Sequence, residues 1–266
     1  MAMADAVRNE DTMTTTTFPH ADSAAARLLH ARRHGAPVPA PRIDDPEAAY
    51  AAQRDVAAAQ GWFDGAPPRH WKSGGPSPAA QTHGALPPGG VMSSPAVAPP
   101  WPAGARWIEA EIALRLGAPI DARAAAALDE TAAALLVDAM CVSIEIVESR
   151  WAEALDAPPL AKLADLQSHG SLVLGAWVPF APPDWGTQAC RVQIGRGPAV
   201  VRRGTHSMGD PAAVLPAWLR HATRDGTVLP AGTVVTTGTW VGMLGARRGD
   251  RVDVRFDGIG DAQVQL

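Results

Sequence analysis

The chain has 266 residues, 47% of them hydrophobic, so it is long enough to bury a proper core as one large domain or a helical lobe plus a main domain. Its formal net charge is −4, and the sequence contains neither a basic stripe for nucleic acid nor a polybasic membrane patch. No apolar run reaches the length of a membrane span, and the first residues lack the apolar core of a signal peptide. The two cysteines, Cys141 and Cys190, are too few for a disulfide framework. We therefore expect a soluble, cytoplasmic protein that acts on small molecules.

The N-terminal part predicts a disordered tail followed by helices. Residues 1–20 have little to bury and are typical of a disordered tail. Helical periodicity then runs from Ala24 to His34. A second helix starts at Asp45-Pro46-Glu47, with an acidic first turn and an early proline, and runs to about Gln60. The sequence thus predicts a helical N-terminal lobe over residues 21–70.

Glycine and proline dominate the next stretch, Gly61 to Pro102, which predicts a long loop of fixed conformation without regular elements. The stretch contains Lys72, which is one of two lysines in the chain; the other is Lys162. Small residues follow in Ser73-Gly74-Gly75-Pro76 and would let a ligand approach the backbone. Arginine cannot replace lysine as a proton carrier of adjustable pKa. On this pattern alone, an exposed lysine in a turn is the simpler interpretation.

Two alternating stretches carry the most informative carboxylates. In the strand pattern from Trp107 to Gly117, Glu109 and Glu111 share one face and the apolar residues occupy the other. The stretch from Cys141 to Arg150 also alternates, so Glu145 is the natural third carboxylate alongside them. Clustered carboxylates repel one another, and a hard divalent ion such as Mg²⁺ or Mn²⁺ would compensate them. Without further context, a solvated outer face of a sheet is the commoner explanation.

The remaining elements follow in irregular order. The pattern predicts helices over residues 122–136, 151–164 and 210–223, and strands over residues 189–195, 199–202, 234–237 and 251–256. Because strands and helices do not alternate regularly, the pattern argues against a doubly wound sheet or a TIM barrel, and we expect an α+β fold.

In this order the stretches resemble the 2-keto-4-pentenoate hydratase / 4-oxalocrotonate decarboxylase branch of the fumarylacetoacetate hydrolase superfamily, from about Asp45 to the C-terminus. The motifs that carry the resemblance are Ala49-Tyr50-Ala51-Ala52-Gln53, the lysine loop Lys72 to Ser77 followed by Gln81 and Gly84, Glu109 to Leu116, Glu145 to Arg150, Ala164 to Gly175, Gly209-Asp210-Pro211, Gly249 to Val252, and Gly258 to Gly260. The resemblance implies a mixed β-roll core in a catalytic domain over residues 71–266, and a homo-oligomer.

The resemblance also implies roles for individual residues. Glu109, Glu111 and Glu145 would bind Mg²⁺ or Mn²⁺, and Lys72, with a lowered pKa close to the cation, would act as a general acid or base. The resemblance adds two further catalytic candidates, Ser168 and Asp165. It also adds four substrate-binding candidates: Ser77, Gln81, His169 and Thr239. Asp165 could equally cap or orient its loop.

The substrate implied is a 2-oxo or 2-hydroxyalkenoic acid, as in the breakdown of aromatic compounds by meta cleavage. Such an acid would be hydrated or decarboxylated. Two alternatives stay open. One is an acylpyruvate C–C hydrolase that uses His83 or His169 as the base, and the other is a non-catalytic partner subunit of the same fold.

Three positions depart from the family pattern. Pro87-Pro88-Gly89-Gly90 stands where hydratases of the family carry an acidic residue, Leu166 replaces an asparagine, and Trp240 occupies a loop where smaller residues are common. These differences predict a pocket reshaped for another substrate.

Overall fold

The computed structural model describes residues 23–77, 79–100 and 105–266. The predicted disordered tail, residues 1–20, lies outside the described residues. The helices are α1 (Ala24–His34), α2 (Pro46–Ala59), α3 (Ala122–Ala126), α4 (Glu130–Ala134), α5 (Pro159–Ala164) and α6 (Leu215–Thr223), with short 3₁₀ turns η1 (Pro88–Gly90), η2 (Ala154–Asp156) and η3 (Pro211–Val214). None of the described helices is long and apolar enough to cross a membrane.

The described strands form two sheets. The larger sheet is built from β1 (His70–Gly74), β2 (Thr82–Ala85), β3 (Val91–Ser93), β5 (Arg106–Leu116), β6 (Val137–Val147), β7 (His169–Leu174), β8 (Val178–Pro179), β11 (Val234–Thr236) and β12 (Leu244–Ala246). The smaller sheet is built from β4 (Ala96–Val97), β9 (Ala189–Ile194), β10 (Val200–Arg203), β13 (Arg251–Phe256) and β14 (Gly260–Gln265).

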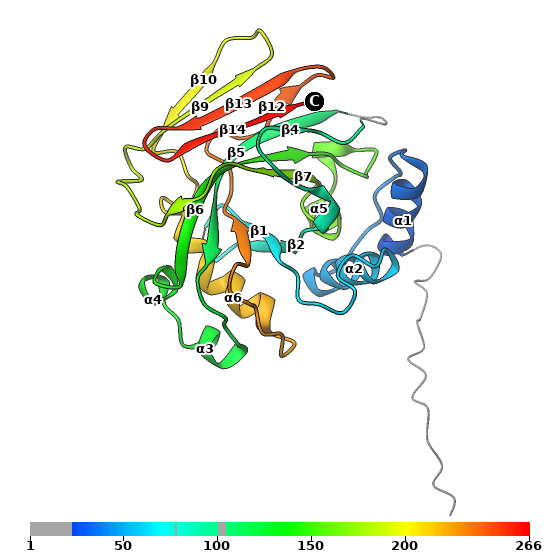
Figure 1. The fold of residues 1–266 in the computed structure, drawn as a ribbon. Coiled ribbons are helices and arrows are strands. Elements are labelled where there is room, and N and C mark those ends of the chain that lie inside the picture. Colours follow the sequence, from blue (N-terminus) through cyan, green and yellow to red (C-terminus); the bar gives the residue numbers. More distant parts are fainter. Residues whose placement is uncertain (1–22, 78, 101–104) are drawn as a thin grey trace, which may run out of the picture.

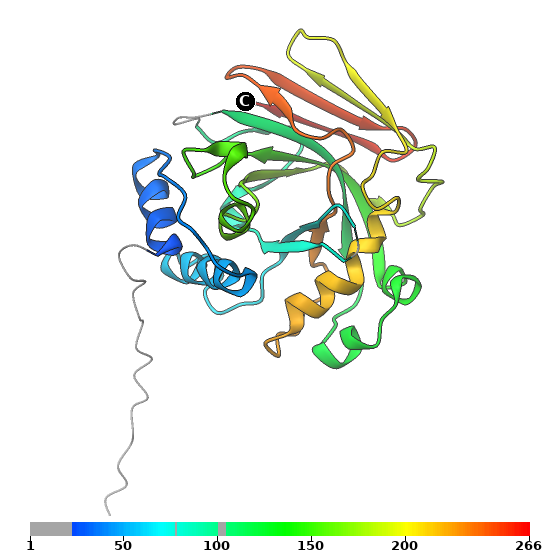
Figure 2. The ribbon, with the colours of Figure 1, turned by 180° about the vertical axis from the view of Figure 1, so that it is seen from behind.

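The strand order confirms the α+β prediction. The larger sheet runs β2-β1-β11-β5-β6-β7-β3, with β12 also paired to β5 and β8 to β6, and the smaller one runs β10-β9-β13-β14-β4. Most pairs are antiparallel, while β1 with β11, β3 with β7 and β4 with β14 are parallel. Figures 1 and 2 show the smaller sheet across one end of the larger one, with α1 and α2 on one side and α6 separate from them.

Local sequence signals account for the N-terminal helices. Ser23 caps α1 by accepting a hydrogen bond from the backbone of Ala26, and Gly35 ends the helix in the left-handed conformation. Asp45 caps α2 in the same way. Both predicted helices are confirmed. Leu28 of α1 and Val56 of α2 pack with Trp151 in a small apolar cluster, whereas the main core fills the space between the sheets and α6. The division into a lobe over 21–70 and a catalytic domain over 71–266 stays a prediction.

The structure corrects the expected loop over Gly61 to Pro102, because this stretch contains strands β1 to β4. β1 pairs with the nearby β2 and also with β11, about 160 residues later, and local composition does not reveal the second pairing.

Two predicted helices are also shorter than expected. The alanine-rich stretch divides into α3 and α4 because Asp129 caps a new helix, accepting from the backbone of Ala132. The stretch after Trp151 is interrupted where Ala157 and Pro158 adopt extended backbone before Pro159.

Candidate metal centre

Three carboxylates converge on one face of the larger sheet. Glu109 of β5 and Glu145 of β6 are directly opposite each other in the antiparallel register, and Glu111 lies two residues further along the same face. One oxygen from each side chain lies within 4.8 Å of the others. The alternation in the two strands predicted that the three carboxylates lie close together, and this is confirmed. They are not on a solvated outer face of the sheet, because Glu111 and Glu145 are buried.

Glu145 is the central acceptor of this cluster. Its Oε1 atom accepts a hydrogen bond from the Nζ atom of Lys72 at 2.5 Å and lies 2.9 Å from Nδ1 of His169. Its Oε2 atom is buried and has no hydrogen-bond partner among the described residues. The Lys72 ammonium also lies 3.5 Å from the carbonyl oxygen of Gln167. Lys72 and His169 thus fix one oxygen of Glu145 and leave the other available.

The second carboxylate is oriented by β11 and the residues after it. The hydroxyl of Thr236 and the backbone N–H of Gly238, the latter at 3.1 Å, both donate to Oε2 of Glu111. Ser143 lies 3.0 Å from the Thr236 hydroxyl and completes a buried chain of polar groups. Sequence reasoning missed Thr236. The available signal was a threonine that ends an apolar strand, Val234-Val235-Thr236, directly before Thr237-Gly238.

The electrostatics of the cluster are those of crowded anions. Burial, reinforced by the charge of Glu145, raises the pKa of Glu109 to about 8 and that of Glu111 to about 7. Burial also acts to raise the pKa of Glu145, but Lys72 and His169 outweigh it and the pKa falls below its ordinary value. Burial acts to lower the pKa of Lys72, yet the carboxylates outweigh it and the pKa is raised. The raised pKa of Lys72 is opposite to the lowered pKa expected from the sequence. The reason is that Glu109, Glu111 and Glu145 surround the ammonium with negative charge.

The residues fit a hard divalent cation. Three carboxylates face a single ammonium, and the pKa values of Glu109 and Glu111 are high because that negative charge is only partly compensated. Carboxylate oxygens are the ligands that Mg²⁺ and Mn²⁺ favour. The unpartnered Glu145 oxygen gives an additional donor atom at the same place.

A cavity of about 430 Å³ opens beside the carboxylates. Four predicted site residues line it: Lys72, Glu109, Glu111 and Thr239. The other lining residues are Ser73, Gly74, Gly75, Pro76, Ala80, Thr82, Val147, Gln167, Ser207, Thr236, Gly238 and Met243. The cavity is large enough for a short organic acid next to the proposed ligands.

Other predicted site residues lie outside this described lining. The backbone carbonyl of Ser77 accepts from Ala80, and Gln81 borders a different cavity and donates to the carbonyl of Ala213 at 3.4 Å. Asp165 is buried in an ion pair with Arg150, whose Nε and backbone N–H donate to it at 2.6 and 2.9 Å. The structure therefore places Asp165 in a position to orient its loop, which was the alternative reading from the sequence.

The loop that Asp165 anchors has an unusual backbone. Leu166, Gln167 and Ser168 adopt positive φ values of 52°, 54° and 60° in succession, a conformation that costs free energy in residues other than glycine. The turn directs Gln167 into the cavity and precedes His169. The hydroxyl of Ser168 is buried and has no hydrogen-bond partner within the described part of the chain.

The three departures from the family pattern do not alter the described cavity lining directly. Pro88 lies in η1, and its neighbours Pro87 and Gly90 border a separate cavity of about 290 Å³. Trp240 is a core residue, with its ring 5.3 Å from that of Phe256, and Leu166 borders another cavity described below. Neither Trp240 nor Leu166 belongs to the described lining of the cavity, and the expectation of a pocket reshaped for another substrate stays a prediction.

Comparison with known proteins places this geometry in a family. A family model described as "Fumarylacetoacetate (FAA) hydrolase C-terminal" matches residues 30–266. The chain belongs to the fumarylacetoacetate hydrolase family. Two curated relatives of Dechloromonas aromatica (strain RCB), named 2-keto-4-pentenoate hydratase 1 and 2, are 35% and 33% identical over 162 residues. Each alignment spans 59% of this chain and 59% of the relative.

Solved structures of fumarylacetoacetate hydrolase-like fold agree with the family assignment. 4-Oxalocrotonate decarboxylase from Pseudomonas putida G7, complexed with magnesium and adipate, matches with a TM-score of 0.78 and 20% identity, over 91% of this chain and 95% of that one. Fumarylpyruvate hydrolase from Pseudomonas aeruginosa, in complex with Mn²⁺ and pyruvate, matches with a TM-score of 0.53 and 16% identity, over 74% and 88%. At these identities the likeness establishes the fold.

Proposed function

We propose that this protein is a divalent-metal-dependent lyase that hydrates or decarboxylates a 2-oxo- or 2-hydroxyalkenoic acid. The observation that carries the proposal is the convergence of Glu109, Glu111 and Glu145 beside Lys72, next to a cavity of substrate size. The names of the relatives support it, because they are hydratases, and so does the fold shared with a decarboxylase complexed with magnesium and adipate.

Glu109, Glu111 and Glu145 would hold the ion, which we propose to be Mg²⁺ or Mn²⁺. When bound, the ion supplies Lewis-acid stabilisation of negative charge on a 2-oxo acid. Thr236 and Gly238 hold the Glu111 carboxylate in one orientation through their hydrogen bonds. Lys72 lines the cavity beside the carboxylates, so its Nζ atom is placed to exchange a proton with a substrate atom there.

The described cavity favours a lyase over a C–C hydrolase. A hydrolase would need a base that faces the cavity, and the two histidines considered for this role, His83 and His169, do not belong to the described lining. His83 is buried against Ser73, 2.9 Å from its hydroxyl, and Nδ1 of His169 faces Glu145.

A partner subunit without activity is also disfavoured, because such a chain has no need to keep three buried carboxylates around one lysine. The homo-oligomer and the cytoplasmic location stay predictions.

The metal dependence can be tested by thermal unfolding with and without Mg²⁺ or Mn²⁺. The wild-type chain should melt at a higher temperature with the ion, because binding to the folded state stabilises it. Glu109→Gln should abolish this increase. The matched control is Glu130→Gln, at an exposed position on α4, which should retain it. A wild-type melting temperature that ignores both ions would contradict the proposal.

The reaction can be tested with 2-hydroxypentadienoate and 2-oxohexenedioate. Mass spectrometry of the products distinguishes the gain of one water from the loss of CO₂. Activity on neither acid nor on other short 2-oxo acids, in a protein that does bind the ion, would instead support the partner subunit.

A further inference from the structure

A second cavity lies on the opposite face of the hairpin formed by β1 and β2. Its volume is about 490 Å³, within the range of pockets that take small molecules. Because side chains alternate along a strand, Trp71 points into this cavity while its neighbour Lys72 points toward the carboxylates. Ala85, the register partner of Trp71 on β2, lines the second cavity as well. The two cavities therefore share one hairpin but face opposite ways.

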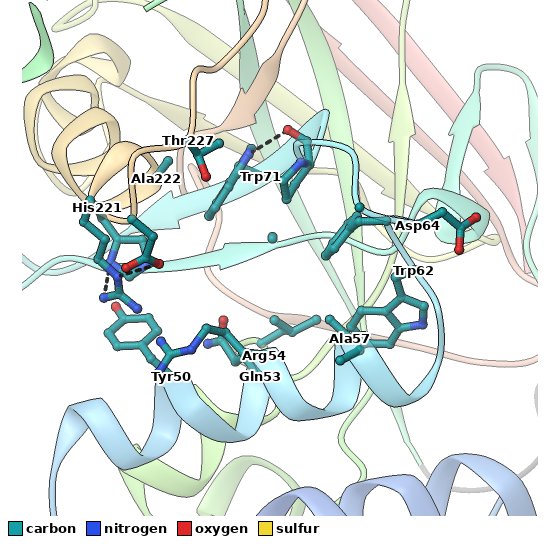
Figure 3. A pocket seen from close by; sticks show the side chains of 18 of the residues that line it. Tyr50, Gln53, Arg54, Ala57, Trp62, Asp64, Trp71, His221, Ala222 and Thr227 are labelled. Carbon is teal, nitrogen blue, oxygen red and sulfur yellow. Dashed lines mark hydrogen bonds and ion pairs between the residues drawn. The ribbon is translucent and has the colours of Figure 1, made fainter. Parts of the chain in front are cut away.

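The second cavity is a slot with aromatic walls. Figure 3 shows Tyr50 and Ala57 projecting from α2 on one side, Trp71 on the other, His221 at one end and Trp62 at the far end. The indole N–H of Trp71 is already used by the carbonyl of Pro68 at 3.2 Å, so Trp71 presents an apolar ring to the slot. Aromatic rings favour offset or edge contacts with another ring. The slot is therefore suited to a flat aromatic ligand.

One end of the slot carries an arginine with weak ionic partners. The Arg224 guanidinium lies 5.2 Å from the Tyr50 ring centre and donates to Nδ1 of His221 at 3.2 Å. The carboxylates of Glu47 and Asp225 each lie 3.7 Å from it, longer than a hydrogen bond, and their side chains are 65% and 73% exposed. Such exposed pairs contribute little. Arg224 is thus free to form a closer, two-point contact with another carboxylate.

His221 supports this role because it is neutral. Burial, followed by the charges of Arg224 and Arg54, lowers the pKa of His221 to about 4, so the ring accepts a hydrogen bond from Arg224 at neutral pH. Arg54 lies on the same wall and is held at 2.7 Å by Glu47. Among the described residues, the charges of Arg54 and Arg224 are opposed by Glu47, Asp64 and Asp225, whose side chains are exposed to solvent.

We propose that the slot formed by Tyr50, Trp62, Trp71, His221 and Arg224 binds a small aromatic carboxylic acid, with its ring between the aromatic walls and its carboxylate on Arg224. The site is distinct from the metal centre and does not depend on the proposed function. The ligand would contact Trp71, the immediate neighbour of Lys72.

The test uses 4-fluorobenzoate as the probe and the full chain in Mg²⁺, with binding followed by ¹⁹F NMR. A parallel titration contains saturating oxalate, which occupies the metal centre and so prevents the probe from binding there. We expect the same dissociation constant in both titrations. Arg224→Gln should weaken binding about tenfold or more, the size expected for a lost charge-assisted contact. The matched control is Arg220→Gln, one turn earlier on α6 and outside the described lining of the slot, which should leave the affinity unchanged.

Two further measurements separate the parts of the proposal. Ala57→Leu fills the slot from α2 and should also block the probe, while the amide 4-fluorobenzamide should bind at least tenfold more weakly than the acid to the wild-type chain. The proposal is overturned if oxalate displaces the probe, if Arg224→Gln binds as the wild type does, if the amide binds equally well, or if no binding occurs at roughly 10 mM probe. Failure of the metal tests leaves these results unaffected, so the two proposals can fail separately.

Discussion

The two faces of the β1–β2 hairpin treat ionisable groups in opposite ways. On the face toward the metal centre, Lys72 and Glu145 are buried as a charged pair within a cluster whose other carboxylates have raised pKa values. On the face toward the aromatic slot, burial lowers the pKa of His83 to about 3 and that of His221 to about 4, so both rings are neutral. The hairpin thus has a buried charged pair on one face and buried neutral histidines on the other. Changes on the two faces should therefore affect different properties, activity on one and stability on the other.

The largest effect is expected from Lys72→Met on the metal-centre face. This change removes the proton carrier while keeping the length of the side chain, so kcat on the substrate identified by mass spectrometry should fall by about 10²- to 10⁴-fold. Lys162→Met is the matched control, because the Lys162 side chain donates to the carbonyl of Leu155 and is outside the described cavity lining, so kcat should stay near the wild-type value. Equal kcat values for Lys72→Met and wild type would remove Lys72 from the mechanism.

On the opposite face, Trp71→Ala should lower stability. Trp71 is 7% exposed and packs edge-on against Trp218, with ring centres 6.4 Å apart, so its truncation leaves a void in the core. We expect the free energy of unfolding to fall by about 3 kcal/mol in urea denaturation. Trp62→Ala, at the more open end of the slot, should cost clearly less. Equal losses for the two variants would contradict the distinction between a packed wall and an open one.

A smaller effect is expected from Thr236→Val, which keeps shape but removes the hydroxyl that donates to Glu111. Partners that orient a ligand typically contribute 10- to 100-fold to metal affinity, and we expect a loss of about tenfold for Mn²⁺ in calorimetric titration. Thr237→Val is a useful comparison. Thr237 donates instead to the backbone carbonyl of Ile112 at 2.7 Å, so its loss should affect stability more than metal affinity. Unchanged affinity in Thr236→Val would mean that Gly238 alone orients Glu111.

The sequence predicted those parts of the site that depend on local periodicity. Alternation along two eleven-residue strands was enough to bring Glu109 and Glu145 together, because a strand allows only two faces. Helices α1 and α2 were predicted for the same reason, since the periodicity of each and the Asp45-Pro46-Glu47 start of α2 lie within one short segment.

The missed features depend on contacts between distant segments. Thr236 meets Glu111 across 125 residues, and β1 joins the larger sheet by pairing with β11. The aromatic slot combines α2, the β1–β2 hairpin and α6, so no single stretch of the sequence predicts it. The role of Asp165 was ambiguous because its partner, Arg150, belongs to another motif. Composition also misled over Gly61 to Pro102, since short strands tolerate glycine and proline when their partners supply the pairing.

The smallest predicted effect concerns pH and sharpens the contrast between the two faces. In the unfolded chain a histidine has a pKa near 6.5, whereas burial, and then the charge of neighbouring groups, holds the pKa of His83 at about 3 and of His221 at about 4 when folded. Below pH 6.5 these histidines bind protons in the unfolded state but stay neutral in the folded state. The stability contributed by the neutral rings is therefore fully present above pH 6.5 and is lost progressively as the pH falls toward 4 and then 3.

His221→Phe keeps a ring against Tyr50 but cannot be protonated, so the decrease in unfolding free energy between pH 7.5 and pH 5 should be smaller than in the wild type, by about 1 kcal/mol. Urea denaturation at the two pH values measures this difference directly. If the variant loses as much stability on acidification as the wild type, the slot does not exclude the protonated ring, and the histidines of this face behave like exposed ones.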